Sequence, residues 1–316
     1  MLISASRRTD IPSYYSDWFF RRIKEGFVLV RNPMNFHQLS RVSLSPDKVD
    51  GIVFWTKNPS PMLDRLNELR DYMYYFQFTL TPYAADIEPN LPAKNEKILS
   101  AFKRLSDTIG SDRVIWRYDP IFINEKYSPA FHTQAFGEIA RELKDYAKKV
   151  IISFIDKDYR GVKDNIKELA MSDFPPTLQI KLSYQLAEIA KAEGLLIETC
   201  AEEMDLKKFG IGQASCIDEK LFEKLLGFPL DINKDKNQRP QCGCATSIDI
   251  GMYNTCLTGC RYCYANYSPG AVKANSANHN PLSPLLCGEI NEADKLSDRD
   301  VKSCRRTQMT LGDFGV

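Results

Sequence analysis

Short apolar runs alternate along the chain with longer segments of helical periodicity. Runs rich in β-branched and aromatic residues, each followed by polar residues, predict strands. They lie at residues 2–6, 51–55, 75–80, 113–118, 150–155, 195–199 and 247–253. Apolar residues at helical spacing predict helices in the segments between them. These are residues 16–26, 61–72, 95–110, 133–149 and 178–194.

This alternation of strands and helices predicts an α/β fold. Strands that are almost continuously apolar are typical of a parallel sheet that is covered on both faces. Seven such strands favour a partial or full TIM-like (β/α) barrel over a doubly wound sheet. The strand that leads into a cysteine motif comes last along the chain. Two further apolar runs, at 28–33 and 38–45, predict a hairpin inserted after the first helix.

The polarity of the chain suggests three parts. Residues 1–230 are expected to form the body of the barrel. A polar linker opens the second part, residues 231–268, whose cysteine-rich strand and loop would complete the barrel. The third part, residues 269–316, is rich in Ser, Asn, Pro and Gly, and we expect loops with one short helix there.

Composition narrows the class of protein. The chain has 316 residues, a formal net charge of +1 and 43% hydrophobic residues, enough for a large core. A net charge near zero gives no electrostatic signature of nucleic-acid binding. The apolar runs are too short to cross a membrane, and the start MLISASRRTD is not an export signal. We therefore expect a cytoplasmic protein.

Charged and polar residues follow the predicted strands. Ligands bind beyond the carboxyl ends of strands in parallel α/β folds, so these side chains should meet at one mouth. The mixture of cations and carboxylates suits a zwitterionic ligand. The residues concerned are Arg8, Asp10, Lys57, Asn58, Arg117, Asp119 and Glu202.

The nine cysteines are all found from Cys200 onward. In a reducing cytosol, metal binding, catalysis or simple burial is a better explanation for them than disulfides. Three belong to the stretch CLTGCRYC, as Cys256, Cys260 and Cys263. Three thiolates in one short loop can bind three irons of a cubane cluster and leave the fourth iron without a protein ligand.

The C-x3-C-x2-C spacing, with Tyr262 before the last cysteine, resembles the signature of radical S-adenosylmethionine enzymes. The order of TKNP, TLT, EPNLP and a strand ending in DP resembles the spore-photoproduct-lyase-like branch of that superfamily. In that branch the cysteine motif comes first and a Thr-Asp-like turn follows, which SRRTDIPSYY resembles. The chain therefore looks circularly permuted, and we expect the strand at 247–253 to lie parallel to residues 2–6, with the cysteine loop beside RRTD.

Most of residues 1–270 also closely resembles a bacterial family, the domain-of-unknown-function 1848 family. The matching stretches are SRRTDIP, VRNP, VFWTKNP, WRYDPI, ETCAE and CGCATSIDIGMYNTCLTGCRYCYAN. The description of this family names no reaction, so the function has to be inferred from the residues of the site.

The radical-enzyme resemblance implies a [4Fe–4S] cluster on the three loop cysteines and a 5′-deoxyadenosyl radical made from S-adenosylmethionine. It also implies an electron donor such as flavodoxin or ferredoxin, and a small-molecule or nucleotide-like substrate. No catalytic residue is assigned. By position, the candidates to bind S-adenosylmethionine or substrate are Thr9, Asp10, Lys57, Asn58, Arg117 and Asp119.

Other functions remain open. The protein could be a zinc-binding barrel without radical chemistry, although the three histidines lie outside the cysteine cluster and zinc sites are usually closed by four Cys or His ligands. The same shortage of histidine argues against a metal-dependent hydrolase. A radical enzyme acting on nucleic-acid lesions would use aromatic side chains to stack bases. The tryptophans lie in apolar runs, where we expect them to be core: Trp18, Trp55 and Trp116.

Four more cysteines predict a second metal site. Cys242 and Cys244 form a C-x-C pair, which suits two ligands on one metal, while Cys200 and Cys216 follow predicted turns or strand ends. Together they would make a closed four-cysteine site for a second iron–sulfur cluster or for zinc. Iron–sulfur is favoured because the first cluster already requires the assembly machinery. The simpler alternative is ordinary buried thiols, as we expect for Cys287 and Cys304.

Overall fold

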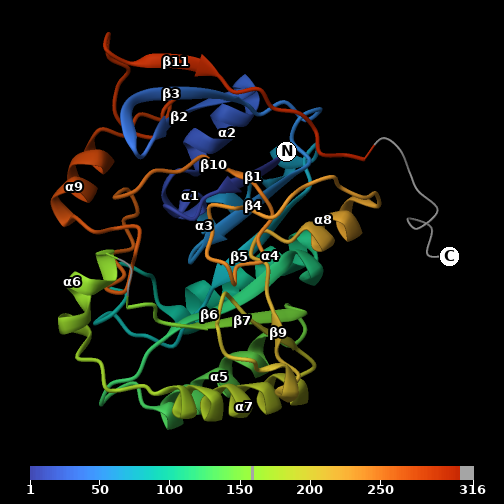
Figure 1. The fold of residues 1–316 in the computed structure, drawn as a ribbon, viewed down its shortest axis with the longest axis vertical. Helices are drawn as coiled ribbons and strands as arrows, with labels where there is room; N and C mark the ends of the chain where they lie inside the picture. The colour runs from blue at the N-terminus through green and yellow to red at the C-terminus, as the bar shows by residue number, and fades with distance from the viewer. Residues whose placement is uncertain (158–159, 307–316) are drawn as a thin grey trace.

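The computed structural model describes residues 1–157 and 160–306 (Figure 1). Within them, an eight-stranded sheet has the order β10-β1-β4-β5-β6-β7-β8-β9, and every neighbouring pair is parallel. The predicted α/β class with a parallel sheet is confirmed. In sheet order, the strands are Ile248–Asp249, Leu2–Ala5, Gly51–Thr56, Tyr74–Thr79, Val114–Ile121, Lys149–Phe154, Leu196–Thr199 and Gly212–Gln213.

The sheet is open rather than closed into a full barrel. Its two edges are β10 and β9, and no strand pairing joins them in the described part of the chain. Full barrel closure, one of the two forms expected, is therefore not what the structure shows. Both edge strands are only two residues long, so little backbone is available for pairing across the seam.

The helices follow the predicted pattern with two kinds of difference. The predicted helix at 61–72 is instead a short α-helix and a 3₁₀ turn, because Leu63, Leu66 and Leu69 are buried at intervals of three, the period of a 3₁₀ helix. Three helices were not predicted: α1 (Ile11–Tyr14), α6 (Arg160–Leu169) and α8 (Glu219–Leu226). The α-helices are α1 Ile11–Tyr14, α2 Ser16–Glu25, α3 Ser60–Leu63, α4 Leu99–Ile109, α5 Pro129–Leu143, α6 Arg160–Leu169, α7 Pro176–Ala192, α8 Glu219–Leu226 and α9 Pro269–Ala277. Single turns are η1 Leu66–Leu69, η2 Lys94–Ile98, η3 Ser111–Arg113 and η4 Lys207–Phe209.

Side chains alternate between the two faces of the sheet, and each face has its own core. One core joins strand residues such as Phe54 and Trp116 to Phe19 and Phe136 of the helices. The other core covers the opposite face, where α8 and the segments that carry three of the cysteines pack against the strands. Its strand members are Leu2, Val53, Tyr75, Ile115 and Ile151, and its covering members include Cys216, Phe222, Cys242 and Cys244.

A second, smaller sheet lies outside the parallel one. Its antiparallel hairpin, β2 (Phe27–Asn32) and β3 (Asn35–Ser43), is the one predicted from sequence. The strand β11 (Lys295–Asp298) joins β3 in parallel and was not predicted in the tail. The helix α9 is the short helix expected there. Residues 307–316 of the tail and Asp158, which follows the predicted strand at 150–155, lie outside the described residues. The proposed boundaries between three parts of the chain stay a prediction.

The first strand of the parallel sheet, β1, lies beside its last strand along the chain, β10, as predicted. β10 pairs in parallel with β1 through Ile3 with Ile248 and Ser4 with Asp249 (Figure 1). In the part of the chain that the structure describes, no helix combines the length and the apolar character needed to cross a membrane.

Candidate functional site

The cysteine loop begins after the β10 strand, at the rim of the sheet. Gly259 has a φ of +70°, a left-handed conformation that glycine adopts without strain, and it lets the chain turn between Cys256 and Cys260. The backbone N–H of Cys263 donates to the carbonyl of Cys260 at 3.1 Å. All three cysteines are half-buried. The loop is therefore compact, with its thiols partly withdrawn from water.

Burial keeps these thiols protonated in the absence of a metal. It raises the pKa of Cys256 to about 12 and raises the pKa of Cys260 well above the usual range, against the opposing effect of Lys57. Burial also raises the pKa of Cys263, although the backbone N–H groups of Ala265 and Asn266 donate to its sulfur. Metal binding would release these protons.

The loop packs against the segment that follows β1, as predicted for RRTD. The Tyr264 hydroxyl donates to the Arg7 carbonyl at 2.7 Å. The hydroxyls of Tyr14 and Thr258 are 3.1 Å apart. Asp10 interacts electrostatically with Cys256. The first and last parts of the sheet thus build one rim together.

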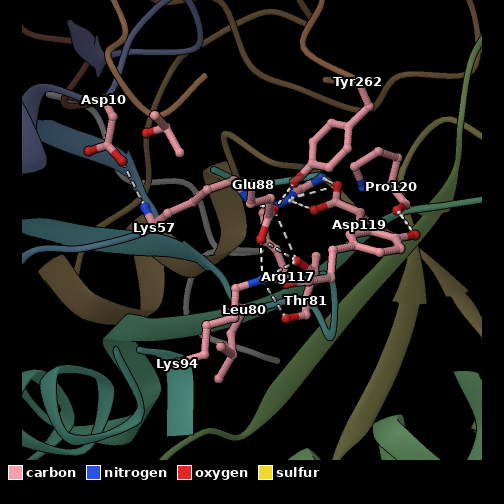
Figure 2. A network of polar contacts seen from close by, with 12 residues as sticks. Asp10, Lys57, Leu80, Thr81, Glu88, Lys94, Arg117, Asp119, Pro120 and Tyr262 are labelled. Atoms are coloured by element: carbon pink, nitrogen blue, oxygen red, sulfur yellow. Dashed lines mark hydrogen bonds and ion pairs between the residues drawn. The ribbon is translucent and has the colours of Figure 1, made fainter. Parts of the chain in front are cut away.

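Beside the loop lies a buried network of charged side chains centred on Glu88 (Figure 2). Its carboxylate accepts hydrogen bonds from Lys57 at 2.7 Å and from the Thr81 hydroxyl at 3.0 Å. Lys94 and the Tyr262 hydroxyl also donate to it. Two ammonium groups and one carboxylate leave a net positive charge next to the cysteine loop.

The pKa of Glu88 shows how strongly this network favours its charged form. Burial alone would raise the pKa, but Lys57 and Lys94 outweigh it and lower the pKa to about 2. Lys57 also interacts electrostatically with Cys260. The sequence analysis placed Lys57 in the site but missed Glu88, Lys94 and the role of Tyr262. Glu88 belongs to EPNLP, a segment singled out only for its place in the order of motifs.

Two of the predicted rim residues have mainly structural roles. The Asp10 carboxylate accepts the N–H of Ser13 at 3.0 Å, capping α1, and the N–H of Lys57 at 2.8 Å. Asn58 similarly accepts the N–H of Ser60 at 3.2 Å. Thr9 differs from both, because its hydroxyl oxygen is buried and has no hydrogen-bond partner among the described residues. Such an atom is suited to bind a ligand.

Arg117 and Asp119 lie beside the Glu88 network and contact the other cysteines (Figure 2). The Arg117 Nε is 3.1 Å from both carboxylate oxygens of Asp119, and its Nη1 is 2.9 Å from the Cys216 sulfur. Asp119 also interacts electrostatically with Lys57 and with Cys200. The pair therefore connects the Glu88 network to the second group of cysteines.

The structure brings Cys200, Cys216, Cys242 and Cys244 into one group, which we call the four-cysteine group. The sulfurs of Cys200 and Cys216 are 3.1 Å apart. Side-chain hydrogen bonds join Cys244 to both Cys216 and Cys242. Cys287 and Cys304 take part in neither cysteine group.

Other predicted residues have structural roles. Arg8 donates through Nε to the carboxylate of Asp249 at 2.9 Å. Asp249 is half-buried and was not predicted as a site residue. Glu202 accepts the N–H of Phe154 at 2.8 Å. Trp18 and Trp116 are fully buried, as expected. Trp55 is only half-buried, and the Arg7 guanidinium lies 5.9 Å from the centre of its ring.

The loop offers the chemistry that a three-cysteine iron–sulfur cluster needs. Its three cysteines are close in sequence, Cys263 accepts N–H···S bonds of the kind that tune such clusters, and the orphaned Thr9 hydroxyl lies in the segment that the loop packs on. Within residues 1–157 and 160–306, no set of three or more His, Cys, Asp or Glu side chains is arranged to hold a metal ion as it stands. Thiols in either group would have to turn toward a metal as it binds.

Comparisons with known proteins identify the family but not the chemistry. Neither a curated protein nor a solved structure matches the chain. The model of one family, described as a domain of unknown function (DUF1848), matches residues 2–265. The chain therefore belongs to the DUF1848 family.

Proposed function

We propose that the protein is a radical S-adenosylmethionine enzyme whose [4Fe–4S] cluster is held by Cys256, Cys260 and Cys263. The observation that carries the proposal is the position of their loop. It follows an edge strand of a parallel α/β sheet, at the rim where ligands bind in such folds, and it contacts the segment after β1. The permuted order of strands expected from the sequence is compatible with this arrangement.

The chemistry supplied by the bound cluster and cofactor is one-electron cleavage of S-adenosylmethionine to methionine and a 5′-deoxyadenosyl radical, which takes a hydrogen atom from the substrate. Cys256, Cys260 and Cys263 would each hold one iron of the cluster, and no fourth cysteine of the loop would compete with the cofactor for the remaining iron. The unpartnered Thr9 hydroxyl would bind a polar group of the cofactor. Lys57, Glu88 and Lys94 together carry a net positive charge. This charge would stabilise the negative cysteine thiolates and the carboxylate of the bound cofactor.

A zinc site in this loop has less support. Closed zinc sites use four protein ligands, and the loop supplies three cysteines. Asp10, which interacts with Cys256, already uses both carboxylate oxygens to accept backbone N–H groups. We also propose a cytoplasmic location, with flavodoxin or ferredoxin as electron donor and a small-molecule or nucleotide-like substrate.

The test is anaerobic reconstitution with iron and sulfide, followed by an assay for 5′-deoxyadenosine in the presence of dithionite and S-adenosylmethionine. The wild-type protein should bind about four irons in this loop and form 5′-deoxyadenosine. Cys260→Ala should do neither, whereas Cys287→Ala, which removes a thiol outside both groups, should behave like wild type. A loop lacking all three cysteines that still cleaves S-adenosylmethionine would overturn the proposal.

A further inference from the structure

The four-cysteine group is built from segments that adjoin the two edge strands of the open sheet. Cys200 directly follows β8, and Cys216 follows the edge strand β9. Cys242 and Cys244 come from the segment that leads into β10, the opposite edge. The group therefore draws its members from both sides of the seam.

Backbone and side-chain contacts already join the two sides. The N–H of Ala245 donates to the carbonyl of Ile217 at 3.0 Å. The Ser215 hydroxyl donates to the carbonyl of Gly243 at 2.9 Å. A Cβ at Gly243 would come within 2.5 Å of that hydroxyl, so the glycine permits the close approach. The segment with the C-x-C pair thus covers the segment with Cys216 without forming a strand pair.

The sulfurs lie close enough together to bind a single ion once the thiols turn toward it. Four thiolates around one tetrahedral ion with metal–sulfur distances of about 2.3 Å lie about 3.8 Å from each other. The sulfurs of Cys200 and Cys216 are 3.1 Å apart, and Cys244 is hydrogen-bonded to two others. A cubane cluster puts each cysteine on a different iron and so holds the sulfurs much farther apart.

The loop cysteines provide an internal comparison. Within the described residues, Cys256, Cys260 and Cys263 influence each other electrostatically but form no sulfur–sulfur hydrogen bonds. Sulfurs that do not contact one another are what a cubane cluster requires, because it puts each cysteine on a different iron. The two cysteine groups therefore differ in the way that a cluster site and a single-ion site should differ.

The surroundings also suit the charge of a zinc tetrathiolate. One Zn²⁺ with four thiolates carries a net charge of −2, which is costly to bury unless it is paired. Arg117 donates to the Cys216 sulfur at 2.9 Å and interacts electrostatically with Cys200. Arg7 interacts electrostatically with Cys244 and Cys216. Each guanidinium also faces a carboxylate, at Asp119 and Asp235 respectively, and so is held in place.

We propose that Cys200, Cys216, Cys242 and Cys244 bind one structural zinc ion that fastens together the two edges of the open sheet. The sequence alone favoured an iron–sulfur cluster at this site, because the first cluster already requires the machinery that assembles such clusters. The sulfur spacing favours zinc instead. The zinc site does not depend on the radical chemistry proposed for the other cysteines.

The experiment is a zinc and iron count on the triple variant Cys256→Ala, Cys260→Ala, Cys263→Ala, purified from cells supplied with both metals. We expect about one zinc per chain and no iron. Adding Cys242→Ser and Cys244→Ser should remove the zinc, whereas adding Cys287→Ser, at an equally buried thiol outside the group, should keep it. The triple variant cannot form the loop cluster, so the count is the same whether or not the wild-type protein cleaves S-adenosylmethionine.

A second measurement covers the case in which the Cys242 and Cys244 variant fails to fold. The folded triple variant is titrated with a mercurial thiol reagent while a zinc-binding dye reports release. Zinc should leave in step with modification of about four thiols, and the melting temperature should fall. About four residual irons in the triple variant would overturn zinc in favour of a second cluster, and absence of any bound metal would overturn the site itself.

Discussion

The carboxylate of Asp249, at the end of β10, accepts a hydrogen bond from the hydroxyl of Ser6 at 2.6 Å, across 243 positions of sequence. It also accepts bonds from the Ser4 hydroxyl at 2.6 Å and the Arg7 N–H at 2.9 Å. Burial would raise the pKa of Asp249, but Arg8 and these donors outweigh it and lower the pKa. This carboxylate therefore fastens the last strand of the sheet to the first.

Asp249→Asn should lower the free energy of unfolding at pH 7 by about 3 kcal/mol, because the half-buried Arg8 would lose its charged partner. A carboxyl group with a lowered pKa stabilises the fold above its unfolded pKa and loses that effect as the pH falls. The difference between wild type and variant should therefore shrink in acid, as measured by urea denaturation. Asp17→Asn, which removes an exposed ion pair with Arg65, is the control and should change stability little. Equal effects of the two substitutions would contradict the role of Asp249.

Gly251→Ala should separate β10 from β1. A Cβ there would lie 2.1 Å from the Ser6 hydroxyl oxygen and 2.5 Å from its Cβ. We expect a loss of about 1–3 kcal/mol of stability and less iron bound in the cysteine loop. Gly270→Ala has open space around its Cβ and should be tolerated.

A double-mutant cycle checks the cause. Ser6→Gly removes both clashing atoms, so the alanine at position 251 should cost less in its presence, although Ser6→Gly itself loses the bond to Asp249. Strictly additive effects in thermal unfolding would show that the clash is not the reason.

Glu88→Gln should damage both stability and activity. The variant leaves Lys57 and Lys94 without a buried counter-charge, which should cost about 3 kcal/mol. Because the pKa of Glu88 is lowered to about 2, the wild-type carboxylate stabilises the fold above its unfolded pKa and loses this effect as the pH falls toward 2. We also expect a drop of about tenfold or more in formation of 5′-deoxyadenosine.

The milder change Tyr262→Phe removes one hydrogen bond to Glu88 and should cost about 1 kcal/mol. Glu142→Gln, which breaks an exposed pair with Lys103, serves as the matched charge control. Full activity of Glu88→Gln after reconstitution would rule out a role for the network in the reaction.

His132 should make the fold sensitive to mild acid. Its ring is fully buried, with Nδ1 2.9 Å from the Tyr118 hydroxyl and Nε2 2.8 Å from the Phe122 carbonyl. Burial lowers the pKa of His132 to about 4, even though the bond to Phe122 opposes this. The neutral ring is favoured in the fold, so stability should fall by about 3 kcal/mol as the pH drops from 6.5 toward 4.

Unfolding free energies measured across that pH range test this directly. His132→Gln should flatten the dependence, and His37→Gln, at an exposed position, should leave it unchanged. A wild-type protein with constant stability over this range would contradict the prediction.

Much of the fold was predictable because its strands are continuous apolar runs. The strands β1, β4, β5, β6, β7 and β8 were each predicted to within a few residues, and the pairing of β10 with β1 followed from the order of motifs. β9 was missed because two residues carry no periodicity. The exposed strand β11 was missed because Lys295–Asp298 has no apolar face.

The site was predictable where spacing reveals chemistry and not where only the fold brings residues together. Cysteine spacing indicated the loop cysteines and the C-x-C pair, whereas strand ends and turns indicated Cys200, Cys216, Lys57 and Arg117. Glu88 and Lys94 were missed because neither ends a strand, and their pairing depends on the turn after β5. The preference for iron–sulfur at the four-cysteine group could not be tested from spacing alone, because the distance between sulfurs is a property of the fold.

The pairing of β1 with β10 also constrains the order of events during synthesis. β1 emerges first from the ribosome, but its partner at Ile248–Asp249 emerges only after most of the chain has been made. Until then one edge of β1 has no partner in the growing sheet, and such edges promote aggregation. Neither cysteine group is complete before the same late stage, since their last members are Cys244 and Cys263. Metal loading and the pairing of β10 with β1 should therefore follow the synthesis of all the other strands of the parallel sheet.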